Sequence, residues 1–377
     1  MSLIDKLLGR PLTLKARKQQ ELTVMTGVPA LGLDAFASIA YGPEAALMVL
    51  LPLGVMGLNY FFSITLIVFF ILISLYLSYM QTIFAYPNGG GAYVVASDNL
   101  GRKSGLWAAI SLLLDYLLNV VVGISAGVGA VVSAFPSMHH HVLSLCLVVL
   151  GMLTLLNLRG IRESGIAFFL PTLLFVICIG IAMAIGLIQS WQFAGHPHPV
   201  IASPEPPPGN SSLSIWLLLT ALANGLTAMT GVEAVSNAVP IFRKPRVKNA
   251  QWTLTVVVGI LGVYLLIMGY LCPAYHIVAM EENQPGYQSI LSQLVAATTG
   301  KSIFYYFSII NIFIVLTYSA QTSFAGFPRV CRLLAEDDYL PHFFAERGRR
   351  LVFSLGIIIL SLFSAILLIA FKGITNN

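Results

Sequence analysis

The sequence predicts an all-α integral membrane protein, and two observations carry this prediction. Hydrophobic residues make up 57% of the 377 positions and charged residues only 9%, whereas a soluble chain needs more charge to cover its surface. Apolar runs long enough to cross a bilayer also recur along the chain. We expect nine transmembrane helices, at 29–52, 59–84, 104–134, 142–158, 164–190, 213–240, 251–272, 302–327 and 351–371.

The basic residues collect on alternate loops between these runs. Of the 20 lysines and arginines, all but Lys301 and Lys372 precede the first run or lie in the even-numbered loops. Cytoplasmic loops carry the excess of positive charge in membrane proteins. We therefore expect a multi-pass protein of the plasma membrane, the inner membrane in a bacterium, with a cytoplasmic N-terminus. The net charge of +5 is explained by this location and indicates no nucleic-acid partner.

The first run contains a predicted interruption. Residues 31–52 carry two carboxylates, Asp34 and Glu44, and the pair Gly42-Pro43 lies between them. Glycine and proline weaken a helix, and an interrupted helix survives in lipid only where protein or a water-filled cavity covers the freed backbone groups. We expect a discontinuous helix that is interrupted at Gly42-Pro43, with a carboxylate beside the break.

A second stretch repeats this pattern. The segment Tyr-Gly-Pro-Glu-Ala at 41–45 is similar to Thr-Gly-Val-Glu-Ala at 230–234. Two interrupted helices in matching positions of two halves indicate the binding site of a secondary transporter. Because a second half of five helices would need a tenth helix, we expect a C-terminally truncated chain. The predicted organisation is a cytoplasmic segment 1–25, a first five-helix repeat 26–190, an extracellular loop 191–212 and an incomplete second repeat 213–377 with helices six to nine.

Carboxylates at membrane depth indicate a cation site. Asp34, Asp115 and Glu233 lie inside apolar runs, and none of the nine runs contains a lysine or an arginine. A carboxylate at the middle of the membrane costs about 2.5–3.5 kcal/mol on the insertion scale. It can be protonated, accept hydrogen bonds or bind a mobile cation, whereas an anion site should contain basic residues. We expect Asp34 and Glu233 to couple transport to protons.

Oxygen-bearing side chains beside the two interruptions complete the predicted site. The substrate or ion-binding set that we expect is Asp34, Tyr41, Asn119, Thr230 and Glu233. Oxygen ligands replace the hydration shell of an alkali cation. Weaker candidates are Glu44, Asp115, Tyr116 and Gly123. For Glu44 the alternative is a cap on the second half-helix, and for Asp115 it is a hydrogen bond between helices.

The sequence contains no motif of a known catalytic centre. It has no His-Glu-x-x-His, no Gly-x-Ser-x-Gly and no phosphate loop. The four cysteines are scattered singly, which argues against a disulfide framework and against a Cys-x-x-Cys metal pair. We therefore expect no enzyme activity, no catalytic residues, no cofactor and no metal beyond a transported ion.

Several motifs resemble those of a known superfamily. Tyr-Pro-Asn-Gly-Gly-Gly-Ala-Tyr at 86–93 resembles the hallmark of the amino acid–polyamine–organocation (APC) superfamily. Within it, the segments at 34–44, 227–240 and 324–329 resemble the KimA/KUP-type potassium–proton importers. The resemblance runs over essentially the whole chain. It implies a LeuT-type inverted repeat in which helices 1 and 6 are unwound at the middle of the membrane.

The resemblance also implies roles for particular residues. Asp34 and Tyr41 on helix 1, with Thr230 and Glu233 on helix 6, would serve potassium binding and proton coupling. On helix 3 the family pattern has a threonine and a serine four residues apart, where this chain has Asn119 and Gly123. Asn119 still offers a carbonyl oxygen, but Gly123 offers no side chain. The sequence is also compatible with a homodimer.

Three functions are consistent with the sequence. The first is import of potassium, an inorganic cation, coupled to protons by alternating access in the lipid bilayer. The second is a proton- or cation-coupled amino acid or polyamine permease of the same superfamily, which would hold a substrate carboxylate at the N-terminus of an unwound half-helix. The third is a non-transporting membrane sensor or a truncated inactive paralogue, in which the unpaired carboxylates would lack a purpose.

Overall fold

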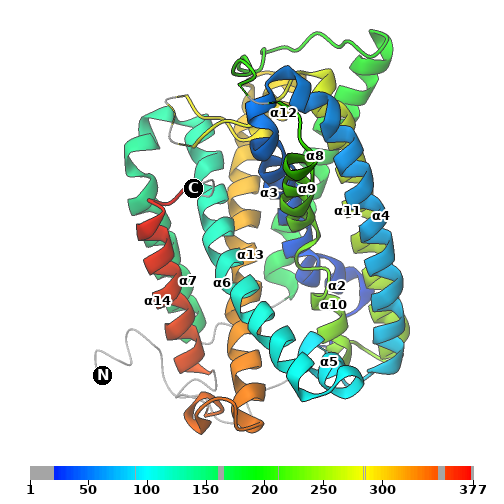
Figure 1. Ribbon diagram of the computed structural model, residues 1–377, viewed down its shortest axis with the longest axis vertical. Helices are drawn as coiled ribbons and strands as arrows, with labels where there is room; N and C mark the ends of the chain where they lie inside the picture. Colours follow the sequence, from blue (N-terminus) through cyan, green and yellow to red (C-terminus); the bar gives the residue numbers. More distant parts are fainter. Residues whose placement is uncertain are drawn as a thin grey trace.

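The computed structural model describes residues 21–89, 91–159, 165–210, 212–282, 284, 286–346 and 353–374. Within these ranges the chain is built of helices (Figure 1), and its extended pairing is limited to an isolated bridge between Leu22 and Phe242. Most of the predicted N-terminal segment, residues 1–20, lies outside the described residues.

Eight helical stretches of the described chain are long and apolar enough to cross a membrane. They match the first eight predicted runs. The ninth run corresponds to α14 (Ser354–Ala370), whose 17 residues are shorter than the typical span of about 20. The main helices of the eight stretches are α2 (Val24–Leu31), α3 (Leu33–Leu50), α4 (Val55–Ala85), α6 (Arg102–Ala134), α7 (Val142–Leu158), α8 (Gly165–Gln192), α9 (Ile215–Gly225), α11 (Arg246–Ala274) and α13 (Ile303–Glu336).

Short helices lie at the two ends of the bundle. α5 (Ala92–Leu100) lies at the lower end in Figure 1 and α12 (Ile290–Thr299) at the upper end. α10 (Ala234–Asn237) follows the interruption in the sixth span. The remaining short elements are the 3₁₀ turns η2 (Leu51–Leu53), η3 (Pro136–His141), η4 (Leu226–Met229), η5 (Val239–Ile241) and η6 (His342–Phe344).

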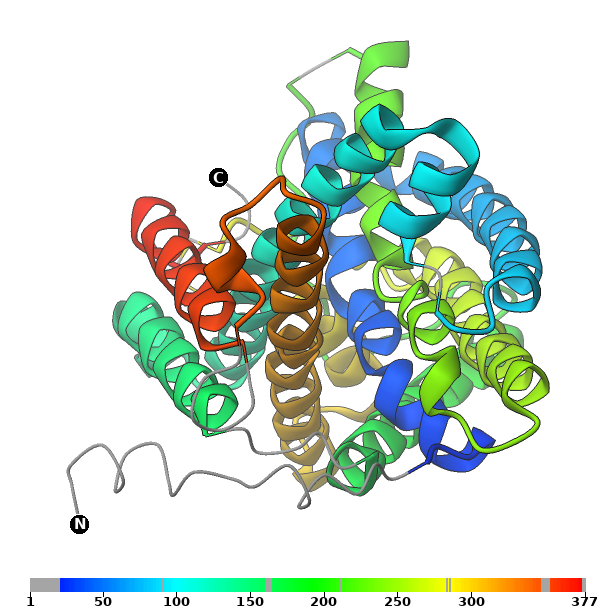
Figure 2. The ribbon, with the colours of Figure 1, turned by 90° about the horizontal axis from the view of Figure 1, so that it is seen from below.

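The buried apolar residues form two clusters, which divide the helices into two groups. One cluster is built by α3, α4, α8, α11 and α12 together with the N-terminal half of α13, and α9 packs against it. The other is built by α6, α7, α14 and the C-terminal half of α13. Figure 2 shows α7 and α14 side by side on one flank, with α13 standing between them and the first group.

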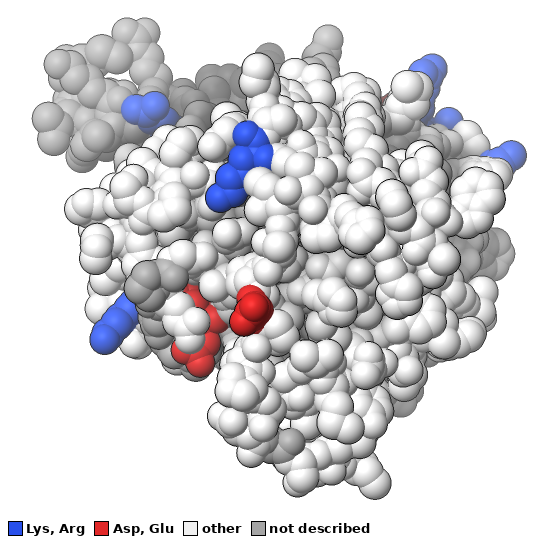
Figure 3. All heavy atoms as spheres, turned by 90° about the horizontal axis from the view of Figure 1, so that it is seen from above, with Lys and Arg blue, Asp and Glu red and all other residues white. Residues whose placement is uncertain are grey.

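Charge is distributed unequally between the two ends. The starts of α6 and α11, which carry Arg102 and Arg246, lie at the lower end with α5 (Figure 1). The upper face in Figure 3 is mostly uncharged, with a few acidic and basic side chains. In the described part of the chain, the basic starts of α6 and α11 thus lie at the same end of the bundle, as the alternation of basic loops in the sequence predicts.

The predicted interruption at Gly42-Pro43 is wrong, because α3 runs through both residues without a break. Proline removes only one backbone donor. Gly42 serves close packing: a Cβ atom there would lie 2.5 Å from the Cβ atom of Ala228 in η4. The Ser38 hydroxyl donates to the Ala228 carbonyl at 2.6 Å across the same contact.

The first span is interrupted at Gly32 instead, between α2 and α3. A Cβ atom at Gly32 would lie 2.7 Å from Cγ2 of Val257, so glycine allows α11 to approach here. The interruption at Gly32 is two residues before Asp34. α3 begins directly after it, so the Asp34 carboxylate lies in the first turn of α3.

The second predicted interruption is present in the structure. α9 gives way to η4, Thr230 is extended with φ −60° and ψ 149°, and Gly231 has φ +80°. A left-handed φ favours glycine. A Cβ atom at Gly231 would also lie 2.6 Å from the Cβ atom of Asp34. Conformation and space therefore both require glycine where the sixth span meets the first.

We predict that Gly42→Ala destabilises the protein, whereas Gly259→Ala does not. The added methyl group at Gly42 meets the η4 backbone and Ala228, and overpacking of this kind costs about 1–3 kcal/mol. Gly259 is also inside a helix, but nothing lies within 4 Å of its added Cβ atom, and alanine is the better helix former by up to about 1 kcal/mol. Thermal unfolding of the two purified variants in the same detergent measures the difference, and equal midpoints would contradict this packing role.

Candidate functional site

Asp34 lies where the first turn of α3 meets the interruption of the sixth span. Its side chain is only 5% exposed. Oδ2 accepts hydrogen bonds from Asn119 Nδ2 at 3.1 Å and from Thr322 Oγ1 at 3.3 Å. Oδ1 is buried and has no hydrogen-bond partner among the described residues. The carboxylate is thus held by one oxygen, while the other retains its full capacity to bind a proton or a cation.

Two hydroxyl residues of α13 belong to this site and were not predicted. Thr322 contacts the Asp34 carboxylate, and Asn119 also donates to Ser323 Oγ at 3.1 Å. The only sequence signal was the pair Thr322-Ser323 inside an apolar run. Asn119 was predicted to offer its amide oxygen to an ion, but its Nδ2 group is the part that contacts Asp34. Asn119 therefore positions the carboxylate.

Tyr41 and Thr230, both predicted, are joined directly. The Thr230 hydroxyl donates to the Thr227 carbonyl at 3.1 Å, so the Tyr41 hydroxyl donates to Thr230 Oγ1 at 2.5 Å. This hydrogen bond connects α3 with the extended residue of the interruption. The two hydroxyl groups and the Asp34 carboxylate come from the same two elements, as the matching motifs indicated.

Glu233 lies two residues beyond Gly231 and is partly buried. The charges of Asp34, Glu233 and Asp115 act on one another. In the part of the chain that the structure describes, no lysine or arginine forms an ion pair with any of these three; the ion pairs are Arg332–Glu336 and His342–Asp338. The site therefore concentrates negative charge without a resident cation to balance it.

The weaker candidates on α6 are placed differently from one another. Asp115 lines the cavity described below. Tyr116 is buried against α13, where a Cβ atom at Gly326 would lie 2.4 Å from its ring. Gly123 also faces α13, and an added Cβ atom would lie 2.9 Å from the Leu316 carbonyl oxygen. The structure thus brings Asp115 to the cavity, while Gly123 serves helix packing.

Glu44 does not cap a second half-helix, because α3 is continuous there. Its Oε1 accepts from the Tyr287 hydroxyl at 2.7 Å, and its Oε2 accepts from the Ile290 N–H at 3.4 Å. Ile290 is the first residue of α12. Burial, together with the nearby Glu44 charge, raises the pKa of Tyr287 well above its usual range, so this hydroxyl stays protonated and donates.

A cavity of about 410 Å³ lies between α3, α6 and η4. Asp34 and Glu233 are not among its lining residues. Those that line it are Tyr41, Glu44, Ala45, Met48, Val49, Asp115, Leu118, Asn119, Val122, Ala126, Asn224, Thr227, Thr230 and Glu282. The cavity thus extends from the Tyr41–Thr230 pair to Glu44 one turn further along α3, and Asn119, which lines it, contacts the Asp34 carboxylate.

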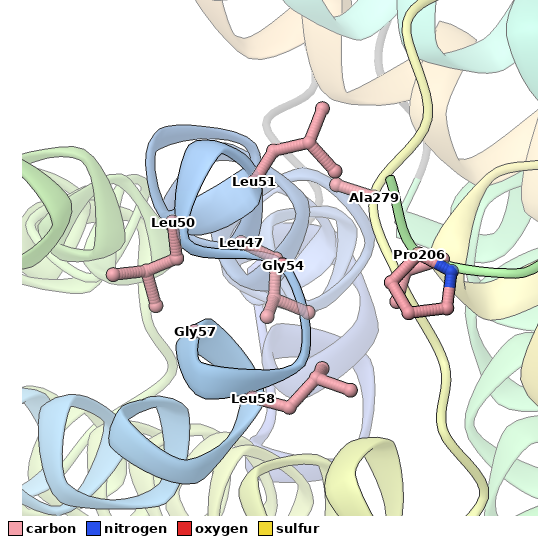
Figure 4. Close-up of a pocket in the computed structure, with 9 residues that line it drawn as sticks. Leu47, Leu50, Leu51, Gly54, Gly57, Leu58, Pro206 and Ala279 are labelled. Atoms are coloured by element: carbon pink, nitrogen blue, oxygen red, sulfur yellow. The ribbon is translucent and has the colours of Figure 1, made fainter. Parts of the chain in front are cut away.

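A second pocket lacks the groups that an ion needs. It is only about 10 Å³ and lies at the turn between α3 and α4 (Figure 4). Leucine, glycine, proline, valine and alanine line it, among them Leu47, Leu50 and Gly57. The larger cavity is therefore the candidate substrate site.

The chain is similar to a known protein family and to two transporters. The sequence model described as "Amino acid permease" matches residues 24–376. The chain is 38% identical over 375 residues to the potassium transporter KimA of Bacillus subtilis (strain 168), which covers 98% of this chain and 60% of that protein. It is 26% identical over 262 residues to an uncharacterized transporter of Legionella pneumophila, covering 63% of this chain and 54% of that protein.

The chain therefore spans about 60% of the length of KimA. The family match covers nearly all of the chain and includes every residue of the site. Because permeases are multi-pass membrane transporters and not enzymes, the match confirms the predicted class. The chain belongs to the amino acid permease family.

Proposed function

We propose that the protein imports potassium ions coupled to protons by alternating access. One observation carries the proposal: Asp34 is buried at the meeting point of α3 and the interrupted sixth span, and within the described chain its Oδ1 atom has no hydrogen-bond partner and its carboxylate has no ion pair. The name of the relative KimA, a potassium transporter, supports the choice of ion. A membrane potential favours inward movement of a cation by about 2.3 kcal/mol per 100 mV.

The proposed roles follow from the geometry. Asp34, Tyr41 and Thr230 supply oxygen atoms to a dehydrated potassium ion, as oxygen ligands do in other potassium sites. Asn119 and Thr322 position the Asp34 carboxylate. Asp34 and Glu233 each bind and release a proton during transport. Two nearby carboxylates repel each other, and a bound proton or a bound cation relieves this repulsion.

The packing of the helices supports a LeuT-type inverted repeat of residues 26–190 and 213–377. A two-fold axis in the membrane plane would relate each helix of the first repeat to the helix five spans later. α3 packs against α9, α4 against α11, α6 against α13, and α7 against α14, and each of these contacts is extensive. These are the four pairs that such an axis predicts.

The two helix groups offer a route to alternating access. Asp34 belongs to the group of α3, α4, α9 and α11, whereas Asn119 and Thr322 belong to the group of α6, α7, α13 and α14. Rocking of one group against the other would therefore make and break the contacts of the carboxylate. We place the lower end with its basic loops, and the N-terminus, in the cytoplasm of a bacterium, by the rule of positive cytoplasmic loops.

We predict that expression of the protein restores growth of a potassium-uptake-deficient bacterium in low potassium, and that Asp34→Asn abolishes the rescue. Asparagine keeps the shape of the side chain but can neither release a proton nor attract a cation. Glu281→Gln is the matched control, since it removes an acidic group of the loop after α11 that lies outside the site. Growth at limiting potassium and membrane expression levels are measured for each strain.

An equally strong rescue by Asp34→Asn would refute the role of this carboxylate. Failure of the unaltered protein to rescue, together with uptake of a labelled amino acid into proteoliposomes, would establish the amino acid permease instead. One observation favours that alternative, namely a cavity of about 410 Å³, which exceeds the needs of a single ion. Against it, Glu233 is the residue that precedes α10, where a substrate carboxylate would meet repulsion.

We predict that Thr322→Val weakens the apparent affinity for potassium, whereas Thr322→Ser retains it. Valine removes the hydroxyl that contacts Asp34 Oδ2 at 3.3 Å and shares its proton with the Ser319 carbonyl at 2.7 Å. Because a full hydrogen bond to a charged group contributes about 1.5–3 kcal/mol, the KM of rubidium uptake should rise by up to about tenfold, with a smaller change in the maximal rate. A normal KM for Thr322→Val would show that the hydroxyl does not position the carboxylate.

A further inference from the structure

Residues 286–299 form a buried element at the upper end of the molecule, which we call the plug. It comprises a short extended segment and α12. Every residue from Ile290 to Thr298 is buried, although this stretch connects two spans. α12 packs against α3, α6, α8 and α13, and it lies at the upper end of the bundle in Figure 1.

Glu44 is the polar link between the plug and α3. Its carboxylate accepts hydrogen bonds from the Tyr287 hydroxyl and from the first N–H group of α12. Glu44 is only 8% exposed, and no described lysine or arginine pairs with it. A carboxylate at a helix N-terminus complements the partial positive charge of the free N–H groups.

A cap on α12 alone does not require Glu44. Ser289 already occupies the N-cap position, and its hydroxyl accepts a hydrogen bond from the Ser292 N–H. Serine is among the best N-cap residues. The carboxylate from α3 therefore adds a connection between two separate elements.

Further polar contacts of the plug lead to α6 and to the N-terminal half of α13, and Gln293 also bonds to the backbone of Val278 after α11. The Ser289 N–H donates to Ser133 Oγ of α6 at 2.9 Å, and Ser292 shares a hydrogen bond of 2.7 Å with Tyr305 of α13. The Tyr287 ring lies against Gly129 of α6, where an added Cβ atom would approach it to 3.2 Å. Glu44 thus connects the group that contains α3 to a plug that is fastened to α6 and α13.

Glu44 also lines the cavity that reaches Tyr41 and Thr230. We propose that Glu44 is a positioning residue for transport: its carboxylate fastens the plug to α3 and so restricts access from the upper face to the cavity. The proposal rests on the proposed transport function, because only a transporter must open and close this route. Opening this route requires α3 and the plug to move apart, so the hydrogen bonds of Glu44 to Tyr287 and Ile290 must break.

The test measures access to the cavity with a membrane-impermeant thiol reagent. Ala126 lines the cavity, so Ala126→Cys reports on reagent entry, and the native cysteines are all buried. Lys301→Cys, at an exposed position beyond the plug, identifies the proteoliposomes whose upper face is turned outward. The rate of alkylation is compared with and without changes at Glu44 and Tyr287.

We expect Tyr287→Phe and Glu44→Ala each to raise the alkylation rate of the Ala126→Cys reporter at least tenfold. Glu44→Gln retains one acceptor oxygen and should raise the rate less. Glu281→Gln is the matched control, because its carboxylate accepts a hydrogen bond from Gln284 of the same loop and is not bonded to Tyr287 or to α12 within the described chain, and it should leave the rate unchanged.

Unchanged rates in both Tyr287→Phe and Glu44→Ala would overturn the proposal. If Glu44→Ala fails to fold, Tyr287→Phe decides alone, since it removes one hydroxyl and keeps the ring against Gly129. The assay contains no transported substrate, so its result does not depend on potassium. If the protein fails the potassium growth test but the variants show faster alkylation, the role of Glu44 stands and only the proposed ion is wrong.

Discussion

The burial of the Asp34 carboxylate without an ionic partner is the constraint on which the site depends. A carboxylate at this depth must be neutralised or hydrogen-bonded, because the surrounding lipid and protein cannot solvate it. Asn119 and Thr322 hold one oxygen, and the left-handed Gly231 lets the backbone of the sixth span approach the same side chain. The interruption at Gly231 therefore lets the sixth span lie directly against Asp34, while two side chains of α6 and α13 hold one of its oxygens.

The sequence predicted the membrane-spanning helices well, and it drew attention to two carboxylates, for a physical reason. A membrane-spanning run must be long, apolar and free of unpaired charge, so Asp34 and Glu233 are conspicuous exceptions. Thr322 escaped notice because hydroxyl groups in helices commonly bond to their own backbone, and Thr322 does donate to the Ser319 carbonyl as well. Tyr287, the partner of Glu44, lies in a loop 243 positions away, and no local pattern identifies such a pair.

The error at Gly42 has a different origin. In a sequence, a glycine can indicate either backbone freedom or the close approach of another element, and only tertiary structure separates the two. Gly231 has a positive φ, whereas Gly42 lies in a regular helix against Ala228. The similar segments at 41–45 and 230–234 thus hold different conformations. They still come together, since a hydrogen bond joins Tyr41 to Thr230.

Membership of the amino acid permease family and a proposed inorganic substrate are compatible, because the fold sets where a substrate binds and the side chains set which one. An amino acid needs a partner for its carboxylate, and transporters of this architecture place that group at the N-terminus of a half-helix. Here Glu233 immediately precedes α10, so the position carries a negative charge of its own. The same interruption that attracts an anion elsewhere becomes suited to a cation once Asp34 and Glu233 both face it. A reversal of substrate charge therefore requires no change in the helix framework.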